Sequence, residues 1–174
     1  DMSLLYIQEH RFNEAFTALE LSELIWESRL KAKKNVNVAS IYTLTGDVYY
    51  QQKEYAKAEE KYKQAVGLYE NFFSPEHPEY VRVISKLAKV YYMQGDKRKA
   101  KKSLQEVVDK YDNFIKAYFP ALSEREKAKY WNTIKSDYEF YVTLAMTFKN
   151  EDQQMIENVF NNADVVVTEK MHIP

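Results

Sequence analysis

Small and aromatic residues recur at helical spacing between Gly46 and Ala65. In the first half of this stretch, Gly46 and Tyr49 lie one helical turn apart. In the second half, Ala58, Tyr62 and Ala65 follow one another at steps of four and three residues. Such steps place each set on one face of a helix. The stretch therefore predicts two helices that meet across a tight turn, in which the small residues let the backbones approach and the tyrosines fill the space beside them.

The same order of residues returns after about 42 residues. Ala88 and Ala100 stand 42 residues beyond Gly46 and Ala58. Upstream, at a shift of 43 residues, the second helix of the pattern is matched by Phe12, Ala15 and Leu19. A lone pair of amphipathic helices would carry no such long-range phase. The recurrence predicts three stacked helix pairs, at about residues 1–35, 36–76 and 77–119.

This pattern resembles the tetratricopeptide repeat (TPR), which has the same order of small, large and aromatic residues. The positions that carry the resemblance are Gly46, Tyr49, Tyr55, Ala58, Tyr62 and Ala65. The usual TPR period is about 34 residues. The longer period here, together with the Pro-x-His-Pro link at residues 75–78, is similar to the kinesin-light-chain type of repeat. The resemblance implies an all-α fold, a right-handed α-solenoid of TPR helix hairpins.

Local sequence signals give approximate helix boundaries. We expect helices at about residues 2–9, 13–34, 38–53, 55–73, 78–94 and 97–118. Gly95 and Asp96 supply a C-terminal glycine and an N-cap acid between the last two of these. Two extra C-terminal helices are expected at residues 123–149 and 151–168, and a capping box of Ser123 and Glu126 opens the first of them. These elements together predict a single TPR-like domain over residues 1–174.

Two of the longer expected helices carry clear apolar stripes. The stripe of the 13–34 helix includes Leu21 and Ile25. In the 123–149 helix, Trp131, Val142 and Met146 widen the stripe beyond what one neighbouring helix would cover. We therefore expect the 123–149 helix to be packed on two sides. Self-association of the chain into a homo-oligomer through this face is an alternative, because large uncovered apolar patches mark interfaces.

Composition narrows the classes of partner. The chain is 45% hydrophobic and 15% aromatic, and its three glycines leave few turns for a β fold. A net charge of −1 gives no long-range attraction to nucleic acid or to an acidic membrane, so neither is expected as a partner. No apolar run reaches the roughly 18 residues that span a bilayer. We expect a cytoplasmic protein, although the first repeat begins partway through a helix, which leaves an upstream secretion signal open.

The residues form no grouping that favours catalysis, and no enzyme activity, metal or cofactor is expected. His10, His77 and His172 fall in a turn, an inter-repeat link and the tail, without metal-ligand spacing. The three glycines form no phosphate-binding loop, and the chain has no cysteine. Neighbouring acids such as Glu59 and Glu60 do not converge on a helix, so paired-carboxylate chemistry has no support.

The TPR resemblance implies that the first helix of each pair lines a concave face, which binds a peptide or protein partner. By register, the partner-binding residues are Asp47, Tyr50, Gln51, Arg82, Lys86, Lys89 and Tyr92, with Thr43 and Ser85 beside them. Arg82 and Lys86 match the basic pair by which some TPR proteins hold a terminal carboxylate through charge-assisted hydrogen bonds. The alternative is that these cations are exposed charges with no dedicated role. The chain is thus expected to be a non-catalytic interaction or scaffold module.

The last third of the chain resembles a second family segment, the one that links TPR arrays to the caspase-like CHAT protease domain in bacterial proteins. The resemblance rests on residues Phe119–Lys127, Tyr130–Trp131, Phe140–Tyr141 and Asn161–Ala163. It implies an alternative function, in which the partner is another domain of the same parent chain and the repeats regulate a protease.

Overall fold

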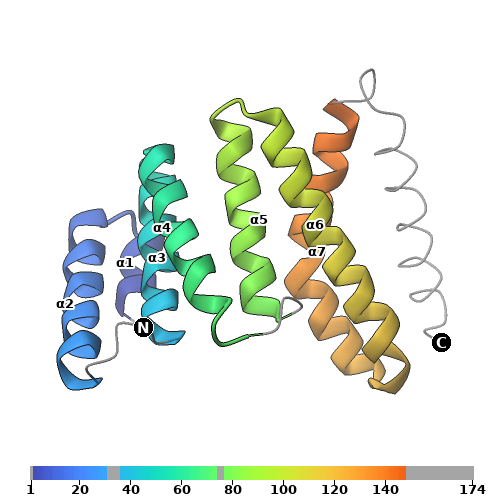
Figure 1. The fold of residues 1–174 in the computed structure, drawn as a ribbon, viewed down its shortest axis with the longest axis horizontal. Helices are drawn as coiled ribbons and strands as arrows, with labels where there is room; N and C mark the ends of the chain where they lie inside the picture. The colour runs from blue at the N-terminus through green and yellow to red at the C-terminus, as the bar shows by residue number, and fades with distance from the viewer. Residues whose placement is uncertain (1, 31–35, 74–76, 148–174) are drawn as a thin grey trace. The chain divides into compact units, whose positions relative to one another are not determined.

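The computed structural model describes residues 2–30, 36–73 and 77–147 of the 174-residue chain. Over these residues the chain forms helices joined by short turns, without a strand (Figure 1). The elements are α1 (Met2–Gln8), α2 (Phe12–Leu30), α3 (Val36–Gln51), α4 (Tyr55–Tyr69), α5 (Pro78–Met93), α6 (Lys97–Tyr118), the 3-10 helix η1 (Phe119–Ala121) and α7 (Glu124–Thr147). The all-α prediction is confirmed. The helix expected at 151–168 lies outside the described residues.

The chain divides into two compact units. Unit 1, residues 1–103, holds α1 to α5 and the first residues of α6. Unit 2, residues 104–174, holds the rest of α6, η1 and α7 in its described part. The expectation of one domain over residues 1–174 stays a prediction.

The turns of unit 1 repeat with the same period as its side chains. Three turns between paired helices each contain one residue with a positive φ: His10 at 57°, Lys53 at 63° and Gly95 at 81°. These residues lie 43 and 42 positions apart. Only glycine adopts this backbone region readily, so its recurrence at a histidine and a lysine is imposed by the tight turn. The backbone thus shows the repeat independently of the side-chain pattern.

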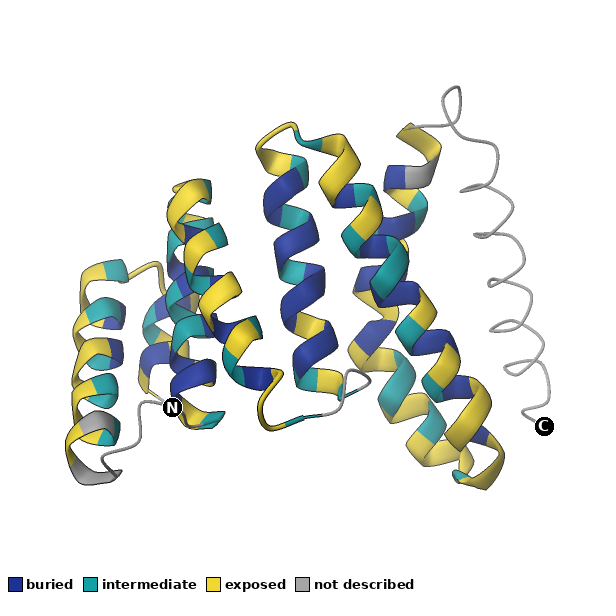
Figure 2. Cartoon of the chain, in the orientation of Figure 1, coloured by how far each residue is buried: buried dark blue, intermediate teal, exposed yellow. Residues whose placement is uncertain are grey.

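Small residues at equivalent positions form the seam between paired helices. On the second helices, the alanines at these positions are all 0% exposed: Ala15, Ala58 and Ala100. On the first helices, the equivalent buried residues are Ser3, Gly46 and Ala88. Successive helices of unit 1 pack on one another from α1 to α5, and Figure 2 shows an almost continuous buried stripe along α5. The predicted phase relation is therefore confirmed.

Two predicted core positions of α2 are wrong. Leu21 and Ile25 are 58% and 42% exposed. In an α-helix they lie about 200° and about 240° around the axis from Leu19, which is buried, so they point away from the face that packs inward. The inward face of α2 is instead formed by Ala15 and Leu19, with Trp26 packed against the same cluster.

The link into α5 is fixed by a histidine rather than by proline alone. His77 is the N-cap of α5, and its Nδ1 accepts the backbone N–H of Glu79 at 3.2 Å. Its ring stacks on Phe73, with 3.6 Å between the ring centroids. Pro78 follows as the first helical residue, where a missing N–H costs nothing. The structural role expected for this histidine agrees with these contacts.

In unit 2, α7 begins at the predicted capping box. The backbone N–H of Ser123 donates to Glu126 Oε2 at 2.9 Å, and the Glu126 N–H donates to Ser123 Oγ at 3.4 Å. One face of α7 is buried, and its core includes Ile134 and Leu144. Met146, expected to widen this face, is 69% exposed, because it lies about 200° around the helix from Leu144. The prediction for Met146 is wrong.

Candidate functional site

A cavity of about 320 Å³ opens in unit 1 on its first helices. Its lining residues come from α1, α3, α4 and α5: Leu4, Ile7, Asp47, Tyr50, Gln51, Tyr62, Lys86 and Lys89. All of them except Tyr62 belong to the first helix of a hairpin. Leu4, Ile7 and the two tyrosines supply apolar surface, while the other side chains are polar or charged. We call this cavity the pocket.

The pocket follows the repeat register. Leu4, Asp47 and Lys89 occupy equivalent positions in three successive hairpins, 43 and 42 residues apart. Ile7 and Tyr50 are likewise equivalent, at a shift of 43 residues. The pocket therefore lies along the helix face that the TPR resemblance assigns to the concave side.

Asp47 is the centre of the polar side of the pocket. Its Oδ1 accepts a hydrogen bond from the hydroxyl of Tyr62 at 2.6 Å and another from Lys86 Nζ at 2.6 Å. The ion pair joins α3 to α5, and the side chains of Lys86 and Asp47 are 27% and 21% exposed. Burial raises the pKa of Tyr62, and the negative charge of Asp47 and the hydrogen bond to it raise it further. The phenol therefore stays a neutral donor to Asp47.

Gly46 determines where the Tyr62 ring lies. A Cβ atom at Gly46 would stand 2.5 Å from Cε1 of Tyr62, closer than real Cβ atoms approach. The ring is 2% exposed and its hydroxyl is bonded to Asp47, so it has little room to move. Tyr49, also expected beside Gly46, instead contacts Phe16 of α2 with ring centroids 4.8 Å apart. The Tyr62 ring therefore fills the space that a side chain at Gly46 would need.

Five of the seven predicted partner-binding residues line the pocket: Asp47, Tyr50, Gln51, Lys86 and Lys89. Arg82 and Tyr92 are not among its lining residues. Arg82 is bonded to Glu79 one turn earlier on α5, and Lys86 is bonded to Asp47, so each cation already has an acidic partner. A carboxylate held jointly by Arg82 and Lys86 stays a prediction, as does the partner-binding role of the whole set.

The residues expected beside this set are buried. Thr43 is 3% exposed and its hydroxyl donates to the Ala39 carbonyl at 2.9 Å. Ser85 is 1% exposed. Both therefore belong to the packing of their helices, and placing them on a binding surface is wrong.

Three lining residues are not among those predicted from the sequence, namely Leu4, Ile7 and Tyr62. The first two had a readable signal, because subtracting the 43-residue shift from Asp47 and Tyr50 gives their positions. Tyr62 was assigned to the seam, where its ring does lie. Its hydroxyl reaches the pocket only because Asp47 stands one residue after the glycine against which the ring packs.

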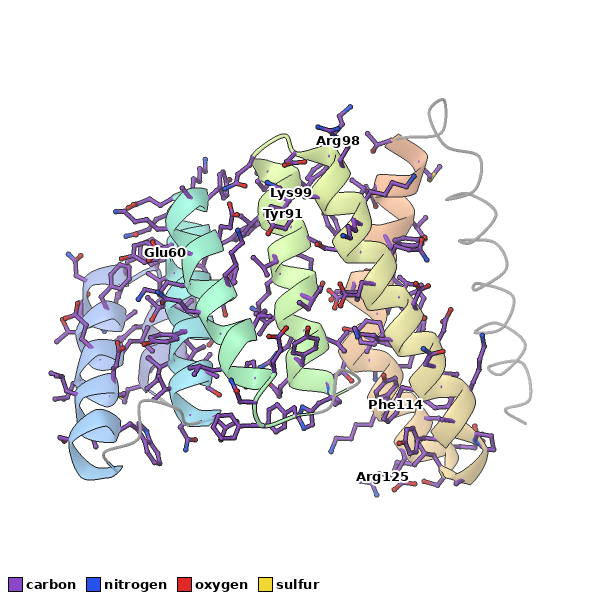
Figure 3. The ribbon with its side chains drawn as sticks, in the orientation of Figure 1. Glu60, Tyr91, Arg98, Lys99, Phe114 and Arg125 are labelled. Carbon is purple, nitrogen blue, oxygen red and sulfur yellow. The ribbon has the colours of Figure 1, made fainter. Side chains whose placement is uncertain are left out.

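A second cluster of charges lies at the start of α6. Figure 3 shows Lys99 beside Tyr91 and Arg98 pointing away from the helices. Lys99 Nζ lies 5.4 Å from the centroid of the Tyr91 ring and 3.0 Å from Asp96 Oδ2. Asp96 also caps α6, because its Oδ1 accepts the backbone N–H of Lys99 at 3.1 Å. The predicted cap is confirmed, and it offsets part of the repulsion between these cations and the positive end of the helix dipole.

Neither a metal centre nor a membrane span emerges from the described part of the chain. Across residues 2–30, 36–73 and 77–147, no three His, Cys, Asp or Glu side chains are grouped so that they could hold a metal ion. Among the helices of those same residues, none combines the length and apolar character needed to cross a bilayer.

The described fold and the pocket define a class, an all-α repeat protein whose successive first helices line a common pocket. The sequence matches the family model of the tetratricopeptide repeat at residues 1–71 and 46–113. The chain belongs to the tetratricopeptide repeat family, whose members generally mediate protein–protein interaction. The family matches end at residue 113, and the resemblance of residues 119–163 to the CHAT-associated segment stays a prediction.

Solved structures share the fold. BtubC (BKLC) from P. vanneervenii matches with a TM-score of 0.75 and 16% identity, over 99% of this chain and 63% of that one. A putative kinesin light chain from Podospora anserina, with nearly identical TPR-like repeats, matches with a TM-score of 0.58 and 16% identity. That match covers 98% of this chain and 86% of the other. No curated protein sequence matches the chain. At these identities the similarity concerns the fold alone, and the chain spans less than two thirds of the BtubC structure.

Proposed function

We propose that unit 1 binds a peptide, or an extended segment of a partner protein, in the pocket. The observation that carries this proposal is the register of the lining residues. Because Leu4, Asp47 and Lys89 are equivalent residues of three successive hairpins, an extended chain laid across the first helices would meet each repeat in turn. The partner is either a separate protein or another domain of the parent chain.

The chemistry of the pocket suits a side chain with an apolar body and a polar end. Leu4, Ile7 and the ring of Tyr50 offer apolar contact, while Gln51 and Lys89 can fix the orientation of a polar group. A volume of about 320 Å³ is at the small end of the range for ligand pockets, about 300 to 1,000 Å³. The pocket therefore holds one or two side chains of a longer segment, and the neighbouring helix surface contacts the rest.

Binding is favoured over catalysis by the same residues. The lining side chains that could exchange a proton or attack a substrate are the two tyrosines, the two lysines and Asp47. Of these, Tyr62, Asp47 and Lys86 are bonded to one another. They hold the helices in register rather than activating a nucleophile.

The proposal can be tested by placing a bulky side chain in the pocket and measuring peptide binding. Peptides would be selected from a displayed random library on the wild-type chain, synthesised with a fluorophore and titrated by fluorescence anisotropy. Gln51→Trp places an indole at the mouth of the pocket, from an exposed position, and should weaken binding about tenfold or more, which corresponds to about 1.4 kcal/mol. The matched control is Gln64→Trp, because Gln64 is also exposed but lies on α4 outside the pocket lining.

The control variant should bind within about twofold of the wild type, which is close to the usual range of neutral surface substitutions. Circular dichroism melts would check that both variants are folded. Equal affinities of the two tryptophan variants for every selected peptide would show that peptides bind elsewhere, and the proposal would be wrong.

A further inference from the structure

We propose that Asp47 sets the charge preference of the pocket, because its carboxylate is an internal competitor of a ligand carboxylate for Lys86. This inference rests on the proposed function. Asp47 and Lys86 come from α3 and α5, in neighbouring hairpins, and their side chains meet with 2.6 Å between Oδ1 and Nζ. An acidic side chain that enters the pocket can reach this lysine only by replacing Asp47 or by sharing the lysine with it.

The charges that line the pocket are unequal. Lys86 and Lys89 are positive and Asp47 is negative, so the lining carries a net charge of +1. Charges interact more strongly in such a partly dehydrated site than in water. An incoming carboxylate is therefore attracted by two lysines but repelled by Asp47 from within the same cavity. The wild-type pocket accepts acidic peptides, but it holds them less tightly than its lysines alone would.

Tyr62 keeps the competitor in place. The Tyr62 hydroxyl donates to Oδ1 of Asp47, and its ring is fixed against Gly46. When Lys86 turns toward a ligand, the Tyr62 bond still holds the Asp47 carboxylate at the pocket wall. The lysine can turn in this way because it is 27% exposed and has a flexible four-carbon stem. Asp47 therefore continues to repel a bound carboxylate after the exchange.

The substitution Asp47→Asn separates charge from structure. Asparagine keeps an oxygen that can accept from Tyr62 and Lys86, but it removes the negative charge and raises the net charge of the lining to +2. The matched control is Glu59→Gln, which removes an equal charge from another acid–lysine pair. Glu59 bonds Lys63 at 2.6 Å on α4, and neither residue lines the pocket.

The probes are one acidic peptide enriched on the wild type and the same peptide with each Asp or Glu changed to Asn or Gln. Asp47→Asn should tighten binding of the acidic peptide about tenfold and change binding of the amide peptide by less than about twofold. Glu59→Gln should leave both affinities near the wild-type values. Raising the salt concentration should reduce the gain of Asp47→Asn, because the gain is electrostatic.

Each result bears on one of the two proposals. Selected peptides that ignore Gln51→Trp would remove the proposed function, and this inference with it. Peptides that respond to Gln51→Trp but bind the wild type and Asp47→Asn alike would leave the pocket in place and overturn the role of Asp47. An equal gain with Glu59→Gln would overturn it too, as an effect of net charge alone.

A second variant covers the case in which Asp47→Asn fails to fold. Lys86→Gln removes the cation for which the two carboxylates compete. The ratio of the affinity for the acidic peptide to the affinity for the amide peptide should be about tenfold smaller in this variant than in the wild type. A ratio of the two affinities that stays as in the wild type would contradict the inference.

Discussion

Both units bond tyrosine hydroxyls to aspartates, but in different surroundings. In unit 1, Tyr62 donates to Asp47, whose side chain is 21% exposed at the wall of the pocket and also binds Lys86. In unit 2, two such bonds cross between α6 and α7. Tyr138 donates to Asp112 at 2.6 Å and Tyr111 donates to Asp137 at 2.8 Å.

The aspartates of the two units differ in how deeply they are buried. Asp112 and Asp137 are 8% and 5% exposed, and burial raises the pKa of Asp112. In unit 2, therefore, the tyrosine–aspartate pairs act as polar cross-links inside a helix hairpin, where an unmatched carboxylate would be costly. In unit 1 the same kind of pair leaves the carboxylate partly exposed at the wall of the pocket and paired with Lys86. The chemistry of the pair is alike, and the two units differ in how much solvent reaches the carboxylate.

The largest expected effect breaks the close packing of unit 1. Gly46→Val would drive a branched side chain into the Tyr62 ring, which is held by its bond to Asp47. We expect a loss of about 3 kcal/mol in the free energy of unfolding, as for severe overpacking. Gly67→Val on α4 is the control, because a Cβ at that glycine meets no atom within 4 Å.

The control should change stability by no more than about 0.5 kcal/mol. Urea unfolding of both variants would measure the difference. Trp26 in α2 reports on unit 1 when Trp131, the other tryptophan of the chain, is replaced by phenylalanine. Equal stabilities of the two valine variants would mean that the Tyr62 ring moves aside at little cost, and that the seam is looser than described.

A smaller effect is expected from removing one cross-link of unit 2. Tyr111→Phe keeps the ring but leaves the buried carboxylate of Asp137 without the Tyr111 hydroxyl bond. Removing a donor from a buried charged group should cost about 2 kcal/mol. The control Tyr118→Phe, at a tyrosine on the same helix that is 55% exposed, should cost less than about 0.5 kcal/mol.

Urea unfolding followed by Trp131 fluorescence, in a Trp26→Phe background, would measure this loss in unit 2. If Tyr111→Phe were as stable as Tyr118→Phe, the crossed bonds would not be cross-links. The buried tyrosine–aspartate pairs of unit 2 would then contribute no more to stability than an exposed tyrosine does.

The comparison also shows what the sequence could predict. The seam was predictable, because Gly46, Ala58 and Tyr62 return at a fixed shift and small residues mark close backbone approach. The turns follow the same period, since the position of Gly95 is occupied by a residue with positive φ in all three helix pairs. Periodicity predicted the helices and their phase, and the repeat register picked out five of the eight residues that line the pocket.

Polar partners were not predictable in this way. Lys86 lies 39 residues from Asp47, and Tyr138 lies 26 residues from Asp112. A stripe of apolar residues indicates which face is buried, but it does not indicate which acid the face will cover. The sequence alone does not distinguish Asp112 from the many acids on helix surfaces, and only the structure shows that Tyr138 lies opposite it. Burial of an acid depends on a donor from another helix, and no spacing rule within one helix contains that information.

The smallest expected effect is a dependence of both units on alkaline pH. Burial is the main cause that raises the pKa of Tyr62, followed by the charge of Asp47. Burial also raises the pKa of Tyr138, followed by its hydrogen bond to Asp112. Since both folded-state values exceed the ordinary value of 10.0, the stabilisation is complete below that pH and is lost as the pH rises toward the folded-state pKa. Ionisation of each of these two tyrosines in the unfolded chain should lower the free energy of unfolding by about 0.4 kcal/mol at pH 10 and by about 1.4 kcal/mol at pH 11.

Phenylalanine variants assign this loss to each unit. Tyr62→Phe should flatten the pH dependence of the unfolding free energy of unit 1, measured by Trp26 fluorescence. Tyr138→Phe should flatten that of unit 2, measured by Trp131 fluorescence. Part of each slope should remain, because burial also raises the pKa of Tyr50 in unit 1 and the pKa values of Tyr130 and Tyr141 in unit 2. Urea unfolding at several pH values from 8 to 11 would give the slopes. If neither variant changed its slope, the two hydroxyls would titrate alike in folded and unfolded chains, and neither could be the neutral donor that holds its aspartate in place.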